Sequence, residues 1–409
     1  MTAPATGARL LDLTRLVSRL GRGPLTGIDR VEYAYLDHLL QTDRPLFGLV
    51  RTGLGFVLLN CAGCAGLAAL VRGDIPLPPA DMIGRILYRN NPVRARAEAA
   101  VRRLSIARAA RPFLARLLRK IPAGSTYLNV GHANLTTRSL HALRRAGLRI
   151  AVMVHDTIPL DHPEFARAGT VQPFARKLAV ASRFADLVIH TTRDARRKTE
   201  IHLARLGRVP EGVVANLGVL RLLPDAADLP PGLDLTRPYF VALGTVEPRK
   251  NHALLLDIWD HFGTGPDAPR LLIIGGRGWV TPELFARLDA LPPGHPVKWL
   301  SGLPDSAVTA LLNGATALLF PSHAEGFGLP AVEAAAAGVP VITSNLDVIK
   351  ELLSDYAVYL DVADIYSWIE TIKTHTNAAR RGDTLKNQYR KHKEPPLWAD
   401  HFKTALRDL

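Results

Sequence analysis

Short apolar runs alternate with longer amphipathic stretches along most of the chain. Apolar runs of about four to six residues, bounded by Gly, Pro, Asn or Asp, are typical of buried strands. The stretch Asp29–Leu40 instead places Val31, Tyr35 and Leu39 on one side, as an amphipathic helix does. Strands that alternate with helices predict an α/β protein with mainly parallel sheets. The expected strands include Phe56–Leu59, Tyr127–Val130, Arg149–Val154, Leu187–His190, Tyr239–Leu243, Arg270–Ile274, Val297–Leu300 and Ala317–Phe320.

The chain has 409 residues, which is enough for two domains. Residues 223–237 are rich in Pro and Asp and lack a hydrophobic period, which is typical of a linker. We therefore expect an N-terminal domain over residues 1–222 and a C-terminal domain over residues 238–385. The remaining residues, 386–409, form a C-terminal tail.

The stretch Ala317–Thr343 carries the strongest chemical signal. A buried strand is followed by a turn at residues 323–328, by a helix that begins near Pro330, and by a second strand. Glu325 lies in the turn and Glu333 lies one turn into the helix. Carboxylates at this edge of a parallel sheet can accept hydrogen bonds from the vicinal hydroxyls of a ribose or a hexose. The alternative for Glu333 is a charge placed only to complement the helix dipole.

Two further polar pairs follow predicted strands. Arg249 and Lys250 lie between the end of Tyr239–Leu243 and the next helix, where they could bind a diphosphate. His155 and Asp156 follow Arg149–Val154 directly, at the kind of edge where α/β proteins build their sites. Read alone, the first pair could be an ordinary exposed pair and the second a structural hydrogen bond.

The charge of the chain adds a class of partner. A formal net charge of +14 and a pI near 10.1 indicate anionic partners, such as a nucleoside diphosphate, an acidic membrane or nucleic acid. The segment Arg85–Lys120 is strongly basic with apolar residues in between, which fits either helices on an anionic membrane surface or a solvated face over a helical core. No nucleic-acid-binding motif is found, so nucleic acid is not expected as a partner.

Other features suggest a cytoplasmic protein. The N-terminus lacks the pattern of a signal peptide. Residues 53–71 carry no charge and raise the question of a membrane span, but a strand followed by a small helix explains them better. Cys61 and Cys64 form one C-x-x-C, too few cysteines for a zinc site, and we expect buried reduced thiols rather than a redox pair.

These motifs resemble one enzyme family. Glu325-Gly-Phe-Gly-Leu-Pro with Glu333 is similar to the Glu-x7-Glu signature of the retaining nucleotide-sugar glycosyltransferases of family 4. The segments His155-Asp-Thr-Ile-Pro-Leu and Glu247-Pro-Arg-Lys-Asn also resemble segments of that family. The resemblance implies the GT-B fold, in which two Rossmann-like domains with parallel sheets face a central cleft. It also implies that the tail crosses back to the N-terminal domain.

The resemblance assigns roles to residues. Arg249 and Lys250 would hold the diphosphate, Glu325 and His155 would contact the sugar, and Glu333 would hold the ribose. Asp156 would orient its loop or the histidine. Weaker assignments are Gly27 and Arg30 in a glycine loop facing the donor, the backbone near Leu303 against the nucleobase, and the loop residues Gly326, Phe327, Gly328 and Leu329.

We therefore expect a retaining hexosyltransferase that uses a GDP- or UDP-sugar and has no cofactor. Mannose is the preferred hexose, and the expected acceptor is a surface polysaccharide or a lipid-linked glycan. The chain contains no Asp-x-Asp motif, so we expect a metal-independent reaction with possible peripheral contact to the inner face of the cytoplasmic membrane. The alternatives are a nucleotide-sugar epimerase, a phosphorylase, or an inactive nucleotide-sugar-binding protein.

Overall fold

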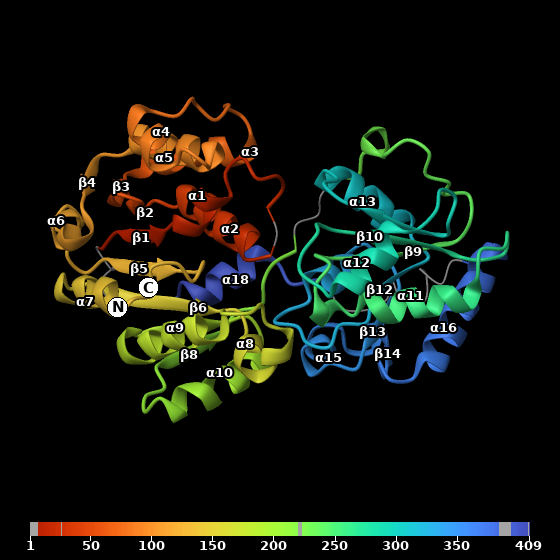
Figure 1. Ribbon diagram of the computed structural model, residues 1–409. Coiled ribbons are helices and arrows are strands. Elements are labelled where there is room, and N and C mark those ends of the chain that lie inside the picture. The colour runs from red at the N-terminus through yellow and green to blue at the C-terminus, as the bar shows by residue number, and fades with distance from the viewer. Residues whose placement is uncertain (1–6, 26, 220–222, 384–393, 408) are drawn as a thin grey trace.

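The computed structural model describes residues 7–25, 27–219, 223–383, 394–407 and 409. It contains two α/β domains that lie side by side, each built around one sheet with helices on its faces (Figure 1). The prediction of two mainly parallel α/β domains is therefore confirmed. The end of the first domain at residue 222, and residues 386–393 of the tail, lie outside the described residues.

The sheet of the first domain has eight strands in the order β4-β3-β2-β1-β5-β6-β7-β8. Neighbouring strands in the run β2-β1-β5-β6-β7-β8 are parallel. Strand β3 instead pairs antiparallel with both β2 and β4. This antiparallel edge departs from the expectation, because β2 and β3 are joined by a tight turn that reverses the chain. The strands are β1 (Arg9–Asp12), β2 (Leu46–Thr52), β3 (Gly55–Leu59), β4 (Ala107–Ala109), β5 (Thr126–Asn129), β6 (Arg149–Val154), β7 (Leu187–His190) and β8 (Glu211–Val214).

Helices cover both faces of this sheet (Figure 1). Several begin at the side-chain caps that the sequence provides, such as Asn60 for α3 and Thr192 for α10. The helices are α1 (Thr14–Arg19), α2 (Ile28–Leu40), α3 (Cys61–Arg72), α4 (Met82–Leu87), α5 (Pro92–Leu104), α6 (Leu114–Leu118), α7 (Thr137–Arg145), α8 (Ile158–Asp161), α9 (Val171–Phe184) and α10 (Arg193–Arg205).

The second domain contains a six-stranded, fully parallel sheet in the order β11-β10-β9-β12-β13-β14. Its strands are β9 (Tyr239–Leu243), β10 (Arg270–Ile274), β11 (Val297–Leu300), β12 (Ala317–Phe320), β13 (Val341–Ser344) and β14 (Ala357–Leu360). Its helices are α11 (His252–Phe262), α12 (Pro282–Asp289), α13 (Asp305–Gly314), α14 (Leu329–Ala336), α15 (Asp347–Leu353) and α16 (Ile365–Arg380).

The uncharged segment 53–71 belongs to the fold of the first domain. It supplies the β2–β3 turn, strand β3 and most of α3, and Leu58 and Leu59 are fully buried. Within the described ranges, no helix has the length and apolar character needed to cross a membrane. Of the two cysteines, Cys64 is buried as expected, and burial raises the pKa of its thiol to about 12. Cys61 is exposed, which corrects our expectation, because it is the first residue of α3 and faces outward.

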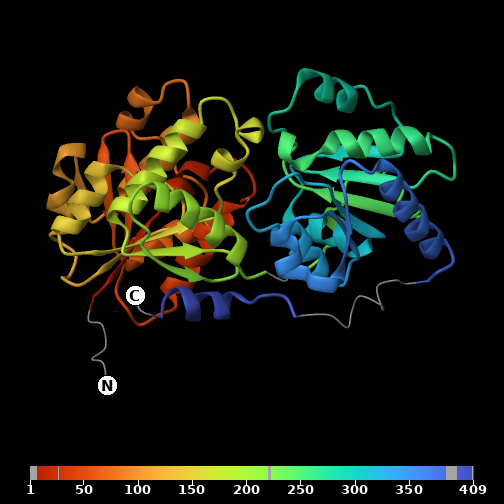
Figure 2. The same ribbon diagram turned by 90° about the horizontal axis from the view of Figure 1, so that it is seen from below.

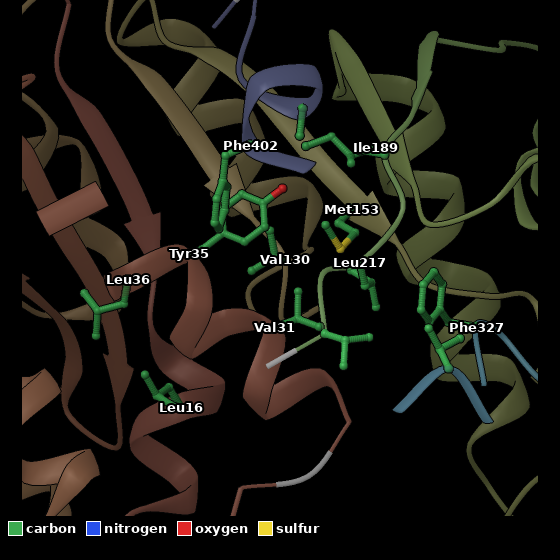
Figure 3. Close-up of a cluster of buried hydrophobic side chains, with 14 of the residues drawn as sticks. Leu16, Val31, Tyr35, Leu36, Val130, Met153, Ile189, Leu217, Phe327 and Phe402 are labelled. Atoms are coloured by element: carbon green, nitrogen blue, oxygen red, sulfur yellow. The ribbon is translucent and has the colours of Figure 1, made fainter. Parts of the chain in front are cut away.

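A continuous apolar core extends from the first domain into the second. Figure 3 shows its first-domain part, with Tyr35 of α2, Met153 of β6 and Ile189 of β7. Phe327, from the loop before α14, belongs to the same buried cluster and lies on the side of Leu217 in this view (Figure 3). The loop that carries the strongest sequence signal is therefore anchored in a core that both domains share.

The last helix, α18 (Trp398–Ala405), packs on the first domain rather than on the second (Figure 2). Phe402 lies edge-on to Tyr35 of α2, with 5.0 Å between ring centroids. His401 Nε2 lies 2.8 Å from the Tyr35 hydroxyl, and its Nδ1 lies 3.1 Å from the carbonyl of Ala215. A neutral imidazole satisfies both contacts, because Nδ1–H donates to the carbonyl while Nε2 accepts from the tyrosine.

The buried His401 makes a testable contribution to the pH dependence of stability. Burial lowers the pKa of His401 from its ordinary value of 6.5 to about 4, so between these values only the unfolded chain takes up this proton. The His401→Gln variant lacks this proton uptake. We expect the stability difference between wild type and His401→Gln to shrink by roughly 3 kcal/mol as the pH falls from 6.5 to 4.

Urea unfolding at several pH values measures this difference. Comparison with His401→Gln isolates the contribution of His401 to the pH dependence of stability from that of buried carboxyls such as Glu32. The raised pKa of the Glu32 carboxyl has the opposite effect, because it favours the folded state as the pH falls. The exposed His261 provides the control variant, His261→Gln. A wild-type–variant difference that stays constant with pH would contradict the assignment.

Candidate functional site

Two loops of the second domain meet at the carboxyl edge of its sheet. Strands β9 and β12 are parallel neighbours, so the segments that follow them leave the sheet at the same edge. Residues 248–250 form a short turn after β9, and residues 321–328 follow β12. The His323 N–H donates to the Arg249 carbonyl, with 2.7 Å between nitrogen and oxygen. This bond holds the two loops together.

Four charged side chains form a cluster between these loops, which we call the charge cluster: Glu247, Arg249, Lys250 and Glu325. Lys250 Nζ lies 2.7 Å from Glu325 Oε1, and Arg249 Nη1 lies 2.8 Å from Glu325 Oε2. Arg249 Nε lies 2.5 Å from Glu247 Oε1. The side chains of Lys250 and Glu325 are almost inaccessible to solvent, with 9% and 5% of their surface exposed. Charges this deeply buried require partners, and here each has one.

The charge cluster shifts the protonation equilibria of its members. Burial alone would raise the pKa of the Glu325 carboxyl, but the adjacent Arg249 and Lys250 outweigh it and lower that pKa to about 2. Burial would lower the pKa of Arg249, yet the carboxylates of Glu325 and Glu247 raise it instead. Glu325 and Arg249 are therefore charged at neutral pH. Burial lowers the pKa of the Lys250 ammonium, and the Glu325 carboxylate opposes this shift.

Local backbone geometry places Lys250 in this position. Gly244, at the end of β9, adopts a φ of +147°, and a Cβ there would come within 3.2 Å of Lys250 Cε. The Lys250 ammonium lies 4.4 Å from the centroid of the Phe320 ring, the last residue of β12. The lysine stem thus passes over a glycine and ends above an aromatic ring, which favours the cation.

The first domain reaches the charge cluster through the loop after β6. Gly326 lies so close to this loop that a Cβ would come within 2.8 Å of Asp156 Oδ2 and 3.0 Å of the His155 carbonyl. Asp156 interacts electrostatically with Arg249, and its Oδ1 accepts a hydrogen bond from Ile158 N in its own loop. His155 is buried, with its Nε2 2.7 Å from the Val130 carbonyl, and burial lowers its pKa to about 4. Its imidazole is therefore neutral.

Glu333 belongs to a second ion pair. Arg30 Nη1 of α2 lies 2.8 Å from Glu333 Oε1 of α14, and both side chains are partly exposed. Burial raises the pKa of the Glu333 carboxyl, while Arg30 opposes this shift. Glycines precede both helices: Gly27 (φ +48°) stands before α2, and Gly328 (φ +83°) stands before α14, where Leu329 begins the helix.

Other contacts connect the two domains near this site. Glu351 of α15 accepts hydrogen bonds from the backbone N–H groups of Arg193 and Asp194, at 2.8 and 3.0 Å, at the start of α10. The ring of His323 stacks on Phe165, with 4.9 Å between centroids. The second domain therefore contacts the first domain at several points near the charge cluster.

The structure brings most of the predicted site residues together. Arg249, Lys250 and Glu325 form one cluster, Asp156 and Gly326 adjoin it, and Arg30 pairs with Glu333. The Phe327 side chain points into the shared core, so only its backbone remains for a ligand. Leu303 lies apart from the charge cluster in sequence, between β11 and α13, and packs on the core.

Sequence reasoning missed two residues. Glu247 lies in the quoted Glu247-Pro-Arg-Lys-Asn segment, but nothing in the pattern said that it would orient Arg249. Glu351 belongs to none of the motifs on which the family resemblance rests. Its capping of α10 depends on how the domains pack, which a local pattern does not encode.

Comparison with known proteins places this site in a family context. Residues 228–391, less than half of the chain, match the family Glycosyl transferases group 1. The chain is 29% identical over 238 residues to the serotype-specific mannosyltransferase WbdA of Escherichia coli, an alignment that covers 54% of this chain and 29% of WbdA. It is 33% identical over 149 residues to the O-antigen chain mannosyltransferase B of Escherichia coli, covering 36% and 38% of the two chains. The matches thus span well under half the length of these relatives.

Solved structures extend the likeness to the whole fold. HepE of Anabaena, solved in complex with UDP-glucose, superposes with a TM-score of 0.58 over 98% of both chains at 14% sequence identity. Sucrose-phosphate synthase of Thermosynechococcus elongatus gives a TM-score of 0.51 at 18% identity, over 74% of this chain and 79% of its own. At such low identities only the fold is shown. The two-domain arrangement is the GT-B fold, as the sequence predicted, and the family match falls mainly on its second domain.

Proposed function

We propose that this chain is a glycosyltransferase that moves a hexose from a nucleoside diphosphate sugar to a glycan acceptor. The proposal rests on the charge cluster, in which two cations flank the buried Glu325 carboxylate at the carboxyl edge of the second sheet. A diphosphate is recognised by cations and sugar hydroxyls are recognised by carboxylates, and this cluster offers both. The group 1 glycosyltransferase match over residues 228–391 supports the same class.

The relatives favour particular substrates. Several are named as mannosyltransferases, two of them of O-antigen chains. We therefore propose mannose from a GDP donor, with glucose or another hexose from UDP as the second choice. The same names support a surface polysaccharide or a lipid-linked glycan as the acceptor.

In the proposed reaction the anomeric configuration is retained. The bond between the anomeric carbon and the β-phosphate oxygen breaks, and the acceptor oxygen bonds to that carbon on the same face. The bonding electrons go to the leaving diphosphate, one of whose oxygens takes the proton of the acceptor hydroxyl. Arg249 and Lys250 stabilise the negative charge that grows on the diphosphate, so we propose that no metal ion is needed.

The remaining residues hold the donor in this proposal. Glu325 and His155 contact the sugar, Glu333 holds the ribose hydroxyls, and the backbone of residues 326–329 binds near the start of α14. Gly27 and Arg30 border the donor from the first domain, Asp156 orients its loop, and the backbone near Leu303 contacts the nucleobase.

A donor panel tests the function. Nucleoside diphosphate sugars are screened by thermal shift and then for transfer to lipid-linked acceptors, with the expectation that GDP-mannose is bound and consumed. Epimerisation of the donor without an acceptor would indicate an epimerase, and consumption only with inorganic phosphate a phosphorylase. Binding without turnover of any donor would leave an inactive nucleotide-sugar-binding protein.

The first variant prediction concerns Lys250. Lys250→Ala removes a cation beside the leaving diphosphate, so we expect kcat/KM to fall by about 100- to 1,000-fold. Near-ultraviolet circular dichroism checks that the variant folds, because Glu325 then has only Arg249 as its partner. The half-exposed Lys373 of α16 provides the control, Lys373→Ala. A Lys250→Ala enzyme with a near-normal rate would remove this lysine from the mechanism.

The second variant prediction concerns Glu333. Glu333→Gln keeps the shape of the side chain but weakens its acceptance from ribose hydroxyls, so we expect the Kd for the nucleoside diphosphate to rise about tenfold. Inhibition by inorganic pyrophosphate, which has no ribose, should not change. Glu370→Gln, at a half-exposed position of α16, is the matched control. Unchanged nucleotide affinity, or an equal loss for pyrophosphate, would show that Glu333 does not hold the ribose.

The third variant prediction concerns Glu247, which we propose as a positioning residue for Arg249. Glu247→Gln should lower kcat about tenfold with little change in KM, because Arg249 loses the carboxylate that orients its Nε. In the Arg249→Lys background the same change should cost little, since there is no guanidinium left to orient. Additive effects in this double-mutant cycle would refute the coupling.

A further inference from the structure

In the basic segment, the apolar residues of α5 and α6 mostly face the core, whereas Phe113, just before α6, is 51% exposed. Val101 of α5, and Leu114, Leu117 and Leu118 of α6, are buried in the core. Helices α5 and α6 therefore turn these apolar side chains inward and most of their arginines outward, with Arg102 buried. A larger apolar contact surface on this part of the molecule comes from other residues.

Helix α4 supplies such a surface. Its residues Met82 and Ile86 are 78% and 75% exposed, and its residues Ile83 and Leu87 are 39% and 44% exposed. The helix packs on α5, and both lie at the top of the first domain in Figure 1. Single exposed apolar residues are common on protein surfaces and need no explanation. Four exposed apolar side chains within six residues form a patch, which is typical of an interaction surface.

The rest of the structure holds α4 in this exposed position. Asp81 caps the helix through Gly84 N at 2.7 Å, and Arg102 of α5 binds the same carboxylate at 2.6 and 2.8 Å. Gly84 faces α5 so closely that a Cβ would come within 2.9 Å of the Ala95 carbonyl. Because the inward side of the helix carries only this glycine, its large apolar side chains point outward.

The charge around α4 is positive. Arg85, Arg89 and Arg94 are exposed, and Glu98 is the only acidic residue between Met82 and Lys120. Glu98 is buried and accepts hydrogen bonds from Tyr88 and Arg94, while Asp81 is bound by Arg102. The nearby carboxylates are thus already paired, Glu98 with Arg94 and Asp81 with Arg102. The exposed Arg85 and Arg89 are available for an external anion.

We propose that α4 docks the protein on an anionic lipid membrane. Met82 and Ile86 enter the boundary between headgroups and acyl chains, and Arg85 and Arg89 bind lipid phosphates. A surface that combines exposed aliphatic side chains with arginines matches an anionic bilayer in both respects. The docking proposal rests on the proposed function in one respect: docking would bring the enzyme to a lipid-linked acceptor.

The test is co-sedimentation of the full chain with lipid vesicles. We expect binding to vesicles of phosphatidylcholine mixed with phosphatidylglycerol, little binding to phosphatidylcholine alone, and weaker binding at high salt. The double variant Met82→Gln/Ile86→Gln should lose at least about tenfold in partitioning, and so should Arg85→Gln/Arg89→Gln. The control is Ile365→Gln/Tyr366→Gln, which changes two exposed apolar residues of α16.

The outcomes separate this inference from the proposed function. Transfer to a water-soluble acceptor should be unchanged in the α4 variants, because α4 contributes no residue to the charge cluster. Failure of wild type to bind anionic vesicles, or equal losses in the α4 and control variants, would overturn the docking proposal. So would a concentration-dependent dimer that only the α4 variants abolish, because α4 would then bind a second copy. Absence of transfer in wild type would refute only the proposed function.

Discussion

The charge cluster imposes the main constraint on this molecule. Glu325 is almost completely buried, and a buried carboxylate is tolerated only when charges and hydrogen bonds replace its hydration. Arg249 and Lys250 supply that replacement from a different loop, 75 residues earlier in the chain. Two loops that could otherwise move independently are therefore held in one arrangement, and the groups proposed to bind the donor are positioned before it arrives.

The same pairing determines what a donor must do to bind. In the charge cluster two basic side chains pair with two acidic ones, so a diphosphate meets basic groups that already have partners. Lys250 has three N–H donors and uses one on Glu325, and each Glu325 oxygen retains acceptor capacity beyond its one cation. Under the proposed function the donor therefore adds hydrogen bonds to the charge cluster without first breaking every ion pair in it.

The sequence predicted the parts of this site that are local and missed the parts that depend on packing. The strand–loop–helix units around Lys250 and Glu325 could be read from apolar runs, glycines and Pro330, because local conformation follows local residues. The antiparallel β3 edge was not predicted, because no marked strand signal was recognised for β2. The apolar residues of the basic segment were left open between membrane and core, since amphipathic spacing is the same in both cases. Only the tertiary structure shows that Leu117 faces inward and Ile86 outward.

Contacts between the domains use the same segments as the proposed donor site. Glu333 is bound by Arg30 of the first domain, and Gly326 packs against the loop that carries His155 and Asp156. A ribose that binds Glu333 would compete with Arg30 for one carboxylate. Donor affinity and the contact between the domains are then thermodynamically linked. If donor binding weakens the Arg30–Glu333 pair, that pair lowers the affinity for the donor by the same free energy. The Glu351 cap on α10 lies outside that competition, so it can hold the domains together while the Arg30–Glu333 pair opens.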